Sequence, residues 1–119
     1  MELVFDNNIP IYVQLLEYLK IYLISGVFKS GDKLPSVRDF ATNFKVNPNT
    51  MQKALGELES MKLIYTERTN GKYVTKDTKL IEKLKDEYAI TLAKSYFNGM
   101  KKIGLGKADS IKYLEGIDD

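Results

Sequence analysis

The stretch KVNPNTMQKALGEL, residues 45–58, holds a group of side chains that could form hydrogen bonds to another molecule. They are the amides of Asn49 and Gln52, the hydroxyl of Thr50 and the ammonium group of Lys53. In the major groove of DNA, a side-chain amide can both accept from and donate to an adenine edge, and a hydroxyl can take either role. Lys can reach guanine acceptors or a phosphate. These residue types suit the reading of base edges, provided that they share one exposed face.

A helix over this stretch would create such a face. At about 100° per residue, the two faces separate cleanly, with Met51, Ala54, Leu55 and Leu58 on one side and Asn49, Gln52, Lys53 and Gly56 on the other. Asn47 is a suitable cap, and Pro48 can open the helix because a first-turn residue needs no amide hydrogen. Taken alone, however, such a polar face fits an ordinary solvated helix surface better than a binding surface.

The residues just before this helix predict a second, shorter one. In LPSVRDFATNF, Ser36 is a good N-cap, and the apolar face is formed by Val37, Phe40, Ala41 and Phe44. Arg38 lies opposite that face, where its charge and the positive end of the helix dipole could both meet a phosphate, although an ordinary surface arginine has the same pattern. Only residues 45–47 separate the two helices, which is typical of a helix-turn-helix.

The segment LIYTERTNGKYVT predicts a β-hairpin after these helices. Its strands are expected at residues 63–66 and 72–75, joined through Asn70 and Gly71, which tolerate the backbone angles of a tight turn. Arg68 and Lys72 flank the turn, so the tip is positive, as in a wing that meets a phosphate backbone. Gly71 would let a DNA backbone approach closely, but a hairpin turn explains it equally well.

The two ends of the chain complete the expected architecture. A first helix is predicted over residues 10–25, ended by Gly26, and a long helix from Asp77 to a stop at Asn98 and Gly99. A shorter helix containing Ile111 and Leu114 follows. The fold class is therefore mainly α with a small β-hairpin: a winged helix-turn-helix domain, residues 1–76, plus a two-helix C-terminal dimerisation segment, residues 77–119.

The C-terminal segment is too short to enclose a core of its own, so its apolar stripe must pack on the first domain, on another copy, or on both. We expect its stripe residues to form a dimer interface, namely Leu84, Tyr88, Leu92 and Tyr96. The aromatic residues could instead line a small-molecule pocket, although aromatics at helical spacing more often form a core or an interface.

Composition excludes several functional classes. The chain has no cysteine and no histidine, which excludes disulfides, thiol nucleophiles and Cys/His zinc sites, so we expect no enzyme, no metal and no cofactor. Residues 29–76 carry nine Lys and Arg against five acids, whereas residues 77–119 carry eight of each. The basic part therefore coincides with the predicted helix-turn-helix and wing. No signal peptide or membrane-spanning run is present in the sequence, so a cytoplasmic location without membrane contact is expected.

Three motifs in this order resemble the N-terminal winged-helix domain of GntR-type bacterial transcription regulators: PIYVQL at residues 10–15, GDKLPSVRDFA at residues 31–41 and VNPNTMQKAL at residues 46–55. The short tail is similar to the YtrA-type branch, in which it serves mainly for dimerisation. The resemblance implies that DNA is contacted by Ser36, Arg38, Asn49, Thr50, Gln52, Lys53, Gly71 and Lys72.

The sequence thus predicts a homodimeric regulator of double-stranded DNA, expected to be a repressor acting at a two-fold symmetric operator. A winged-helix module that binds another protein and no DNA is the alternative. Whether a small-molecule effector controls the protein is left open by the residues.

Overall fold

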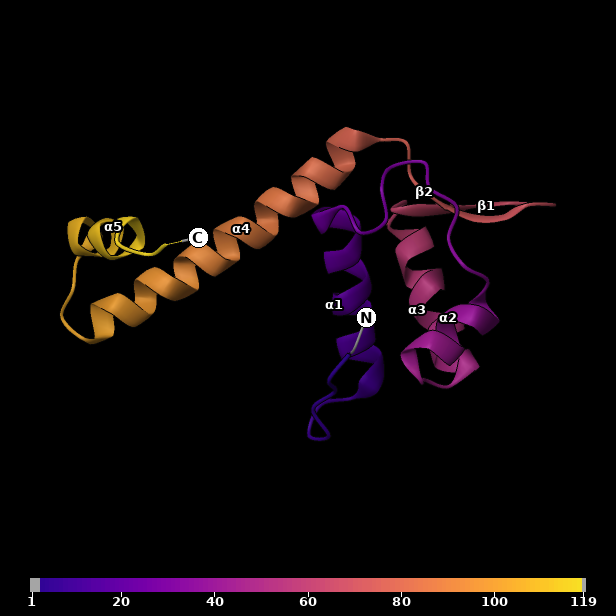
Figure 1. Ribbon diagram of the computed structural model, residues 1–119, viewed down its shortest axis with the longest axis horizontal. Coiled ribbons are helices and arrows are strands. Elements are labelled where there is room, and N and C mark those ends of the chain that lie inside the picture. The colour runs from indigo at the N-terminus through magenta and orange to yellow at the C-terminus, as the bar shows by residue number, and fades with distance from the viewer. Residues whose placement is uncertain (1–2, 119) are drawn as a thin grey trace. The chain divides into compact units, whose positions relative to one another are not determined.

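The structure is a computed structural model that describes residues 3–118 and divides the chain into two compact units, Met1–Glu82 and Lys83–Asp119 (Figure 1). In chain order the elements are α1 (Ile11–Ser25), α2 (Val37–Phe44), α3 (Pro48–Ser60), β1 (Ile64–Glu67), β2 (Gly71–Val74), α4 (Thr78–Lys102) and α5 (Lys107–Glu115). These elements confirm the predicted fold class, which is mainly α with one antiparallel hairpin after three helices.

The helix ends follow from local side-chain chemistry. The Ser36 hydroxyl accepts a hydrogen bond from the backbone N–H of Asp39 at 3.1 Å. The Asn47 side chain accepts one from the backbone N–H of Asn49 at 2.8 Å. Each bond satisfies an amide that the first turn of a helix leaves without a partner. Gly26 ends α1 with a φ of 84°, a left-handed angle that glycine adopts at little cost.

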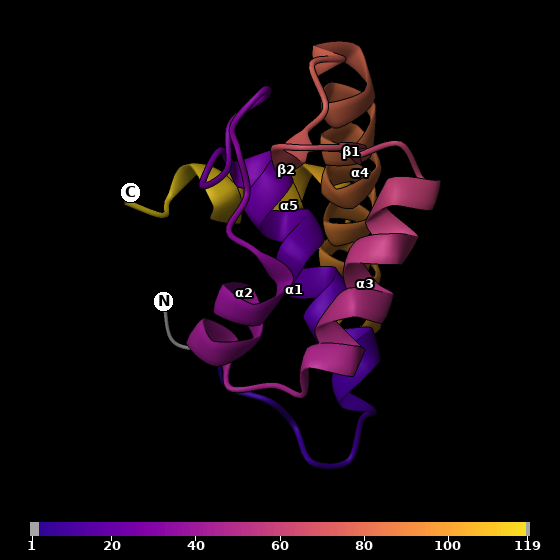
Figure 2. The ribbon, with the colours of Figure 1, turned by 90° about the vertical axis from the view of Figure 1, so that its right-hand side faces the viewer.

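The core of the first unit lies where α1 and α2 pack against α3 (Figure 2). It contains Leu15, Leu19 and Leu23 of α1, Phe40, Ala41 and Phe44 of α2, and Met51, Ala54, Leu55 and Leu58 of α3. Ile64 and Val74 extend this core beneath the hairpin. Full burial of each large apolar side chain contributes roughly 1.5–3 kcal/mol, so one face of α3 is held firmly and the other is free to contact a ligand.

The hairpin differs from expectation in its turn. Glu67 pairs with Gly71, so three residues, 68–70, connect the strands instead of the expected tight Asn70-Gly71 turn. The backbone N–H of Asn70 donates to the Glu67 carbonyl at 3.2 Å. Gly71, which follows the connection, has a positive φ of 108°. A three-residue connection needs only one residue of positive φ. Gly71 supplies it, so Asn70 need not adopt a left-handed angle.

A third segment pairs with the hairpin. The Leu34 amide donates to the Lys72 carbonyl at 2.8 Å, and the Val74 amide donates to the Asp32 carbonyl at 2.8 Å. These bonds fasten the chain just before α2 to β2.

In the second unit, the expected helix stop at Asn98 and Gly99 is wrong. The helix α4 continues through both residues to Lys102, and the chain turns at Gly104, which has a φ of 86°. A glycine inside a helix costs only about 1 kcal/mol relative to alanine, which neighbouring turns can offset. The Tyr96 hydroxyl donates to the Ser110 carbonyl at 2.8 Å and so joins α4 to α5. Among the described residues, no helix has the length and apolar character needed to cross a membrane.

Candidate nucleic-acid interface

The exposed face of α3 carries the polar side chains that the sequence analysis identified. Asn49, Gln52 and Lys53 are exposed, and Thr50 is half-buried at the edge of that face. The opposite face is fixed in the core through Met51 and its apolar neighbours. The helix therefore presents amide and hydroxyl groups from a backbone that cannot easily rotate.

One of these polar side chains has a partner from another helix. The Lys53 ammonium lies 4.5 Å from the centroid of the Tyr12 ring on α1. A cation over an aromatic face gains about 0.5–1 kcal/mol at an exposed site, so this contact restricts Lys53 without burying its charge. Sequence reasoning missed Tyr12 because helical spacing places it beside the apolar stripe of α1. An aromatic residue at such a position gives no sign of a contact with Lys53.

The start of α2 combines a cap with an exposed cation. Ser36 holds the first turn through its bond to the Asp39 amide, and Arg38 is exposed. The amides at a helix start point outward along the axis and carry partial positive charge. The carboxylate of Asp39 lies in the same turn and offsets part of that charge.

The hairpin and the start of α2 border a common hollow of about 540 Å³. Its lining includes Lys33, Ser36, Thr66, Asn70, Gly71 and Lys72. The structure thus brings Ser36 together with Gly71 and Lys72, which are far apart in the sequence, because the segment before α2 is hydrogen-bonded to β2. Lys33 was missed by sequence reasoning; its isolated bridge to Tyr73 is a tertiary contact without a local signal.

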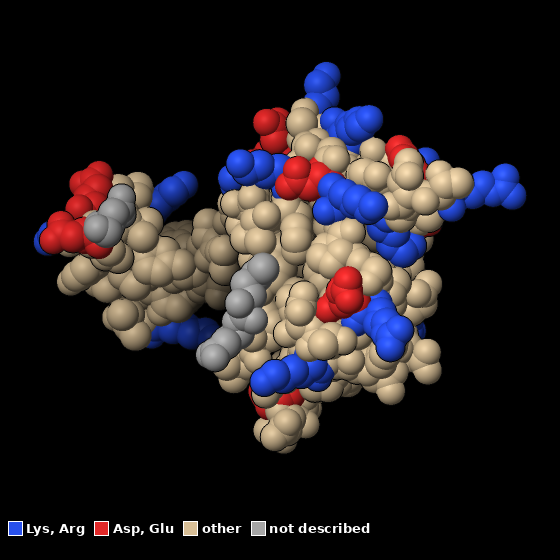
Figure 3. Space-filling model, turned by 45° about the vertical axis from the view of Figure 1, so that its right-hand side comes forward, with Lys and Arg blue, Asp and Glu red and all other residues tan. Residues whose placement is uncertain are grey.

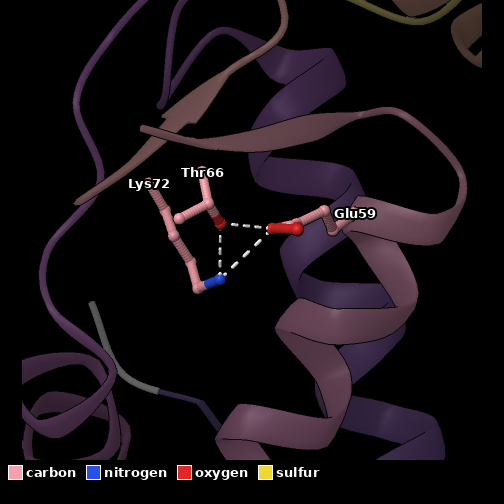
Figure 4. Close-up of polar contacts among 3 residues, drawn as sticks. All are labelled: Glu59, Thr66 and Lys72. Atoms are coloured by element: carbon pink, nitrogen blue, oxygen red, sulfur yellow. Dashed lines mark hydrogen bonds and ion pairs between the residues drawn. The ribbon is translucent and has the colours of Figure 1, made fainter. Parts of the chain in front are cut away.

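Lys72 is not a free charge at the hairpin tip. Its Nζ lies 2.9 Å from Thr66 Oγ1 and 3.2 Å from Glu59 Oε1, and the Thr66 hydroxyl donates to the same Glu59 oxygen (Figure 4). The Lys72 side chain is only 19% exposed. Residues 68–70 of the connecting turn are all exposed, and the cation among them is Arg68.

The carboxylate of Glu59 responds to these two partners. The hydrogen bond from Thr66, followed by the hydrogen bond and charge of Lys72, holds the pKa of Glu59 below its ordinary value, against the opposing effect of partial burial. Glu59 is therefore ionised at neutral pH, and its charge compensates that of Lys72.

Positive charge on the first unit is distributed over its surface. Figure 3 shows Lys and Arg side chains spread over the visible face, with Asp and Glu side chains between them. The Lys and Arg side chains are therefore not gathered into a single basic tract on this face.

Residues 11–74 match the bacterial regulatory proteins of the gntR family. The chain belongs to this family. The uncharacterized HTH-type transcriptional regulator YhcF of Bacillus subtilis (strain 168) is 34% identical over 113 residues, which cover 95% of this chain and 91% of YhcF. The HTH-type transcriptional repressor YtrA of the same strain is 44% identical over 73 residues, 61% of this chain and 56% of YtrA.

Two solved structures of this kind resemble the chain. A GntR family transcriptional regulator from Listeria monocytogenes is 39% identical, with a TM-score of 0.87, and the match covers 96% of this chain and all (100%) of that one. The AraR DNA-binding domain, in complex with the operator ORX1, is 26% identical over 63% of this chain and 96% of its own, with a TM-score of 0.57.

These matches confirm the resemblance to GntR-type and YtrA-type regulators. They place the chain among transcriptional regulators and not among enzymes. The individual DNA-contacting residues and the dimer interface stay predictions.

Proposed function

We propose that this GntR-family regulator is a sequence-specific repressor that binds a two-fold symmetric operator as a homodimer. The observation that carries the proposal is the division of α3 into a buried apolar face and an exposed face of amides and hydroxyls. A helix held in this way can enter a major groove and present hydrogen-bonding groups to base edges in one register.

Each part of the first unit has its own proposed contact. On α3, base edges are read by Asn49, Thr50, Gln52 and Lys53. At the start of α2, Ser36 and Arg38 contact phosphates, where the helix dipole adds to the charge of Arg38. At the wing, Gly71 admits the DNA backbone and Lys72 donates to a phosphate. Base contacts supply specificity, and phosphate contacts supply register and affinity.

The second unit supplies the proposed dimer contact. On α4, Tyr88 and Tyr96 are half-buried, together with Leu84, and Leu92 is 69% exposed. An apolar hollow of about 320 Å³ between α4 and α5 is lined by residues that include Phe97, Ile111 and Leu114. A second copy would cover these apolar side chains, so we assign residues 77–119 to dimerisation and residues 1–76 to DNA binding. The repressor would act in the cytoplasm, where its operator lies.

Selection of bound duplexes from a random pool, followed by footprinting, tests this function. We expect an enriched palindrome whose half-sites lie about one helical turn apart, roughly 34 Å, or slightly more. Arg38→Ala should weaken binding to the selected duplex. If no palindrome is enriched, the proposed function is wrong, and the protein-interaction module, whose partner binding Arg38→Ala would not affect, becomes the better explanation.

A further inference from the structure

Three residues from three elements form a closed set of hydrogen bonds beside the wing (Figure 4). The Thr66 hydroxyl of β1 donates to Glu59 Oε1 of α3, and the Lys72 ammonium of β2 donates both to Thr66 Oγ1 and to the same Glu59 oxygen. The set therefore joins both strands of the hairpin to the helix that we propose reads DNA.

The strand register shows what this contact holds. Ile64 pairs with Val74 at the buried base of the hairpin, and Thr66 pairs with Lys72 two residues farther toward the turn. Since side chains alternate between the two faces of a strand, these two pairs lie on the same face. The buried pair fixes the base of the hairpin on the core, and the polar set fixes its outer half on α3.

Glu59 occupies an unfavourable place for a free carboxylate. It lies in the last turn of α3, which ends at Ser60, and the negative end of the helix dipole disfavours an acid there. The bonds from Thr66 and Lys72 compensate for this position. The carboxylate is therefore best explained by its contacts with the wing, not by helix stability.

Lys72 keeps a capacity to bind an external acceptor. An ammonium group has three hydrogens, and the two bonds to Thr66 and Glu59 use two of them. The third remains for an acceptor outside this set, such as a phosphate oxygen.

We propose that Glu59 is a positioning residue for DNA binding, which holds Lys72 and the outer half of the wing in the geometry that meets the DNA backbone. This inference rests on the proposed function, in which Lys72 contacts a phosphate. Glu59 itself touches no DNA, because its charge would repel a phosphate; it acts through Lys72 and Thr66.

Two substitutions separate the position of Glu59 from its charge. Glu59→Gln keeps an oxygen that can accept from Thr66 and Lys72 and removes the negative charge, whereas Glu59→Ala removes both. With the full-length protein and the duplex selected by the wild type, we expect Glu59→Gln to bind at least as tightly as the wild type. Glu59→Ala should bind DNA about tenfold more weakly than Glu59→Gln. A change of this size lies within the range of interaction energies between residues in contact.

Two further measurements exclude a purely structural role. In a Lys72→Met background, Glu59→Ala should change the affinity for DNA less than it does in the wild type, since only the bond between Glu59 and Thr66 is then left to lose. Thr66→Val keeps the shape of the side chain but removes the hydroxyl that bonds Glu59 and Lys72. Like Glu59→Ala, it should weaken DNA binding. Glu57 is exposed two residues earlier on the same helix, so Glu57→Gln and Glu57→Ala serve as matched controls and should bind DNA equally.

The possible outcomes are distinguishable. Equal affinities for Glu59→Ala and Glu59→Gln would overturn the inference while leaving the proposed function intact. Tighter binding by Glu59→Ala than by Glu59→Gln would also overturn it, since Glu59 would then compete with DNA for Lys72. An undiminished effect of Glu59→Ala in the Lys72→Met background would show that Glu59 does not act through Lys72 and would overturn the inference. If the wild type selects no duplex, the proposed function fails first, and this inference with it.

Discussion

At the scale of single residues, side-chain chemistry separates base contacts from phosphate contacts. Gln52 and Arg38 are both exposed, but they lie on different helices and carry different groups. An amide donates and accepts in a fixed pattern that matches one base edge, whereas a guanidinium binds any phosphate. The two residues should therefore affect DNA binding in different ways.

Gln52→Ala should change base preference, whereas Arg38→Ala should weaken binding to every sequence. Loss of a bidentate base contact costs about 1–3 kcal/mol at one base pair, and loss of one phosphate contact lowers the slope of log affinity against log salt by about one. Affinities for single-substitution variants of the selected duplex, measured at several salt concentrations, distinguish the two. An equal loss on all sequences for both variants would contradict this division.

Glu59 should give the stability of the protein a component that depends on pH. Its pKa in the folded state is lowered, so the unfolded chain binds more protons as the pH falls below the ordinary pKa of a glutamate. This contribution is fully present above that value and is lost as the pH falls through the lowered pKa. Urea unfolding from neutral to acid pH should show a loss for the wild type that is smaller in Glu59→Gln. Parallel curves for the two proteins would exclude the contribution.

At the scale of elements, helix starts depend on a few local bonds. The Asn47 side chain accepts a hydrogen bond from the backbone N–H of Asn49 at the start of α3, and no apolar contact can replace that bond. A cap thus stabilises the helix that carries the proposed base contacts.

Asn47→Ala should lower the free energy of unfolding by about 1 kcal/mol through loss of the cap. Asn43, an exposed residue inside α2, provides the control, because alanine is at least as favourable there as asparagine. Urea denaturation of both variants measures the difference. Equal stability of Asn47→Ala and Asn43→Ala would show that the cap contributes nothing.

At the scale of the whole molecule, the second unit has more apolar surface than it covers by itself. Within the described residues, α4 has no buried residue, and Ile90, Leu92, Ile111 and Leu114 are each about half exposed or more. The Tyr96–Ser110 bond joins the two helices but leaves this surface open. Association with a second copy is the proposed way to cover it.

Leu92→Lys should therefore shift the protein from dimer toward monomer, because it places a charge in the apolar contact. Glu87→Lys introduces the same side chain at an exposed position of the same helix, about 140° away around its axis, and should leave the dimer unchanged. Sedimentation at several protein concentrations measures both. A monomeric wild type, or an unaffected Leu92→Lys, would place the dimer contact elsewhere or nowhere.

By itself, the sequence determined the helices, their caps, the hairpin and the exposed polar face of α3. These features depend on residues within a few positions of one another, such as Ser36 with Asp39 or Asn47 with Asn49. Local patterns were less successful at chain turns: Gly99 did not end α4, and the strands meet through residues 68–70 and not through Asn70 and Gly71 together. Gly99 permits a bend that the hydrogen bonds of α4 do not require, whereas Gly71 adopts the positive φ that helps to close the turn.

Only the tertiary structure decided what Lys72 and Lys53 contact. Lys72 meets Glu59, thirteen positions away, and Lys53 meets Tyr12, on a helix from the other end of the domain. Such pairs form when the burial of apolar faces brings elements together, so the spacing of residues along the sequence does not predict them. The residue types therefore predicted which groups could contact DNA, whereas the packing of α1, α3 and the hairpin determined how those groups are held.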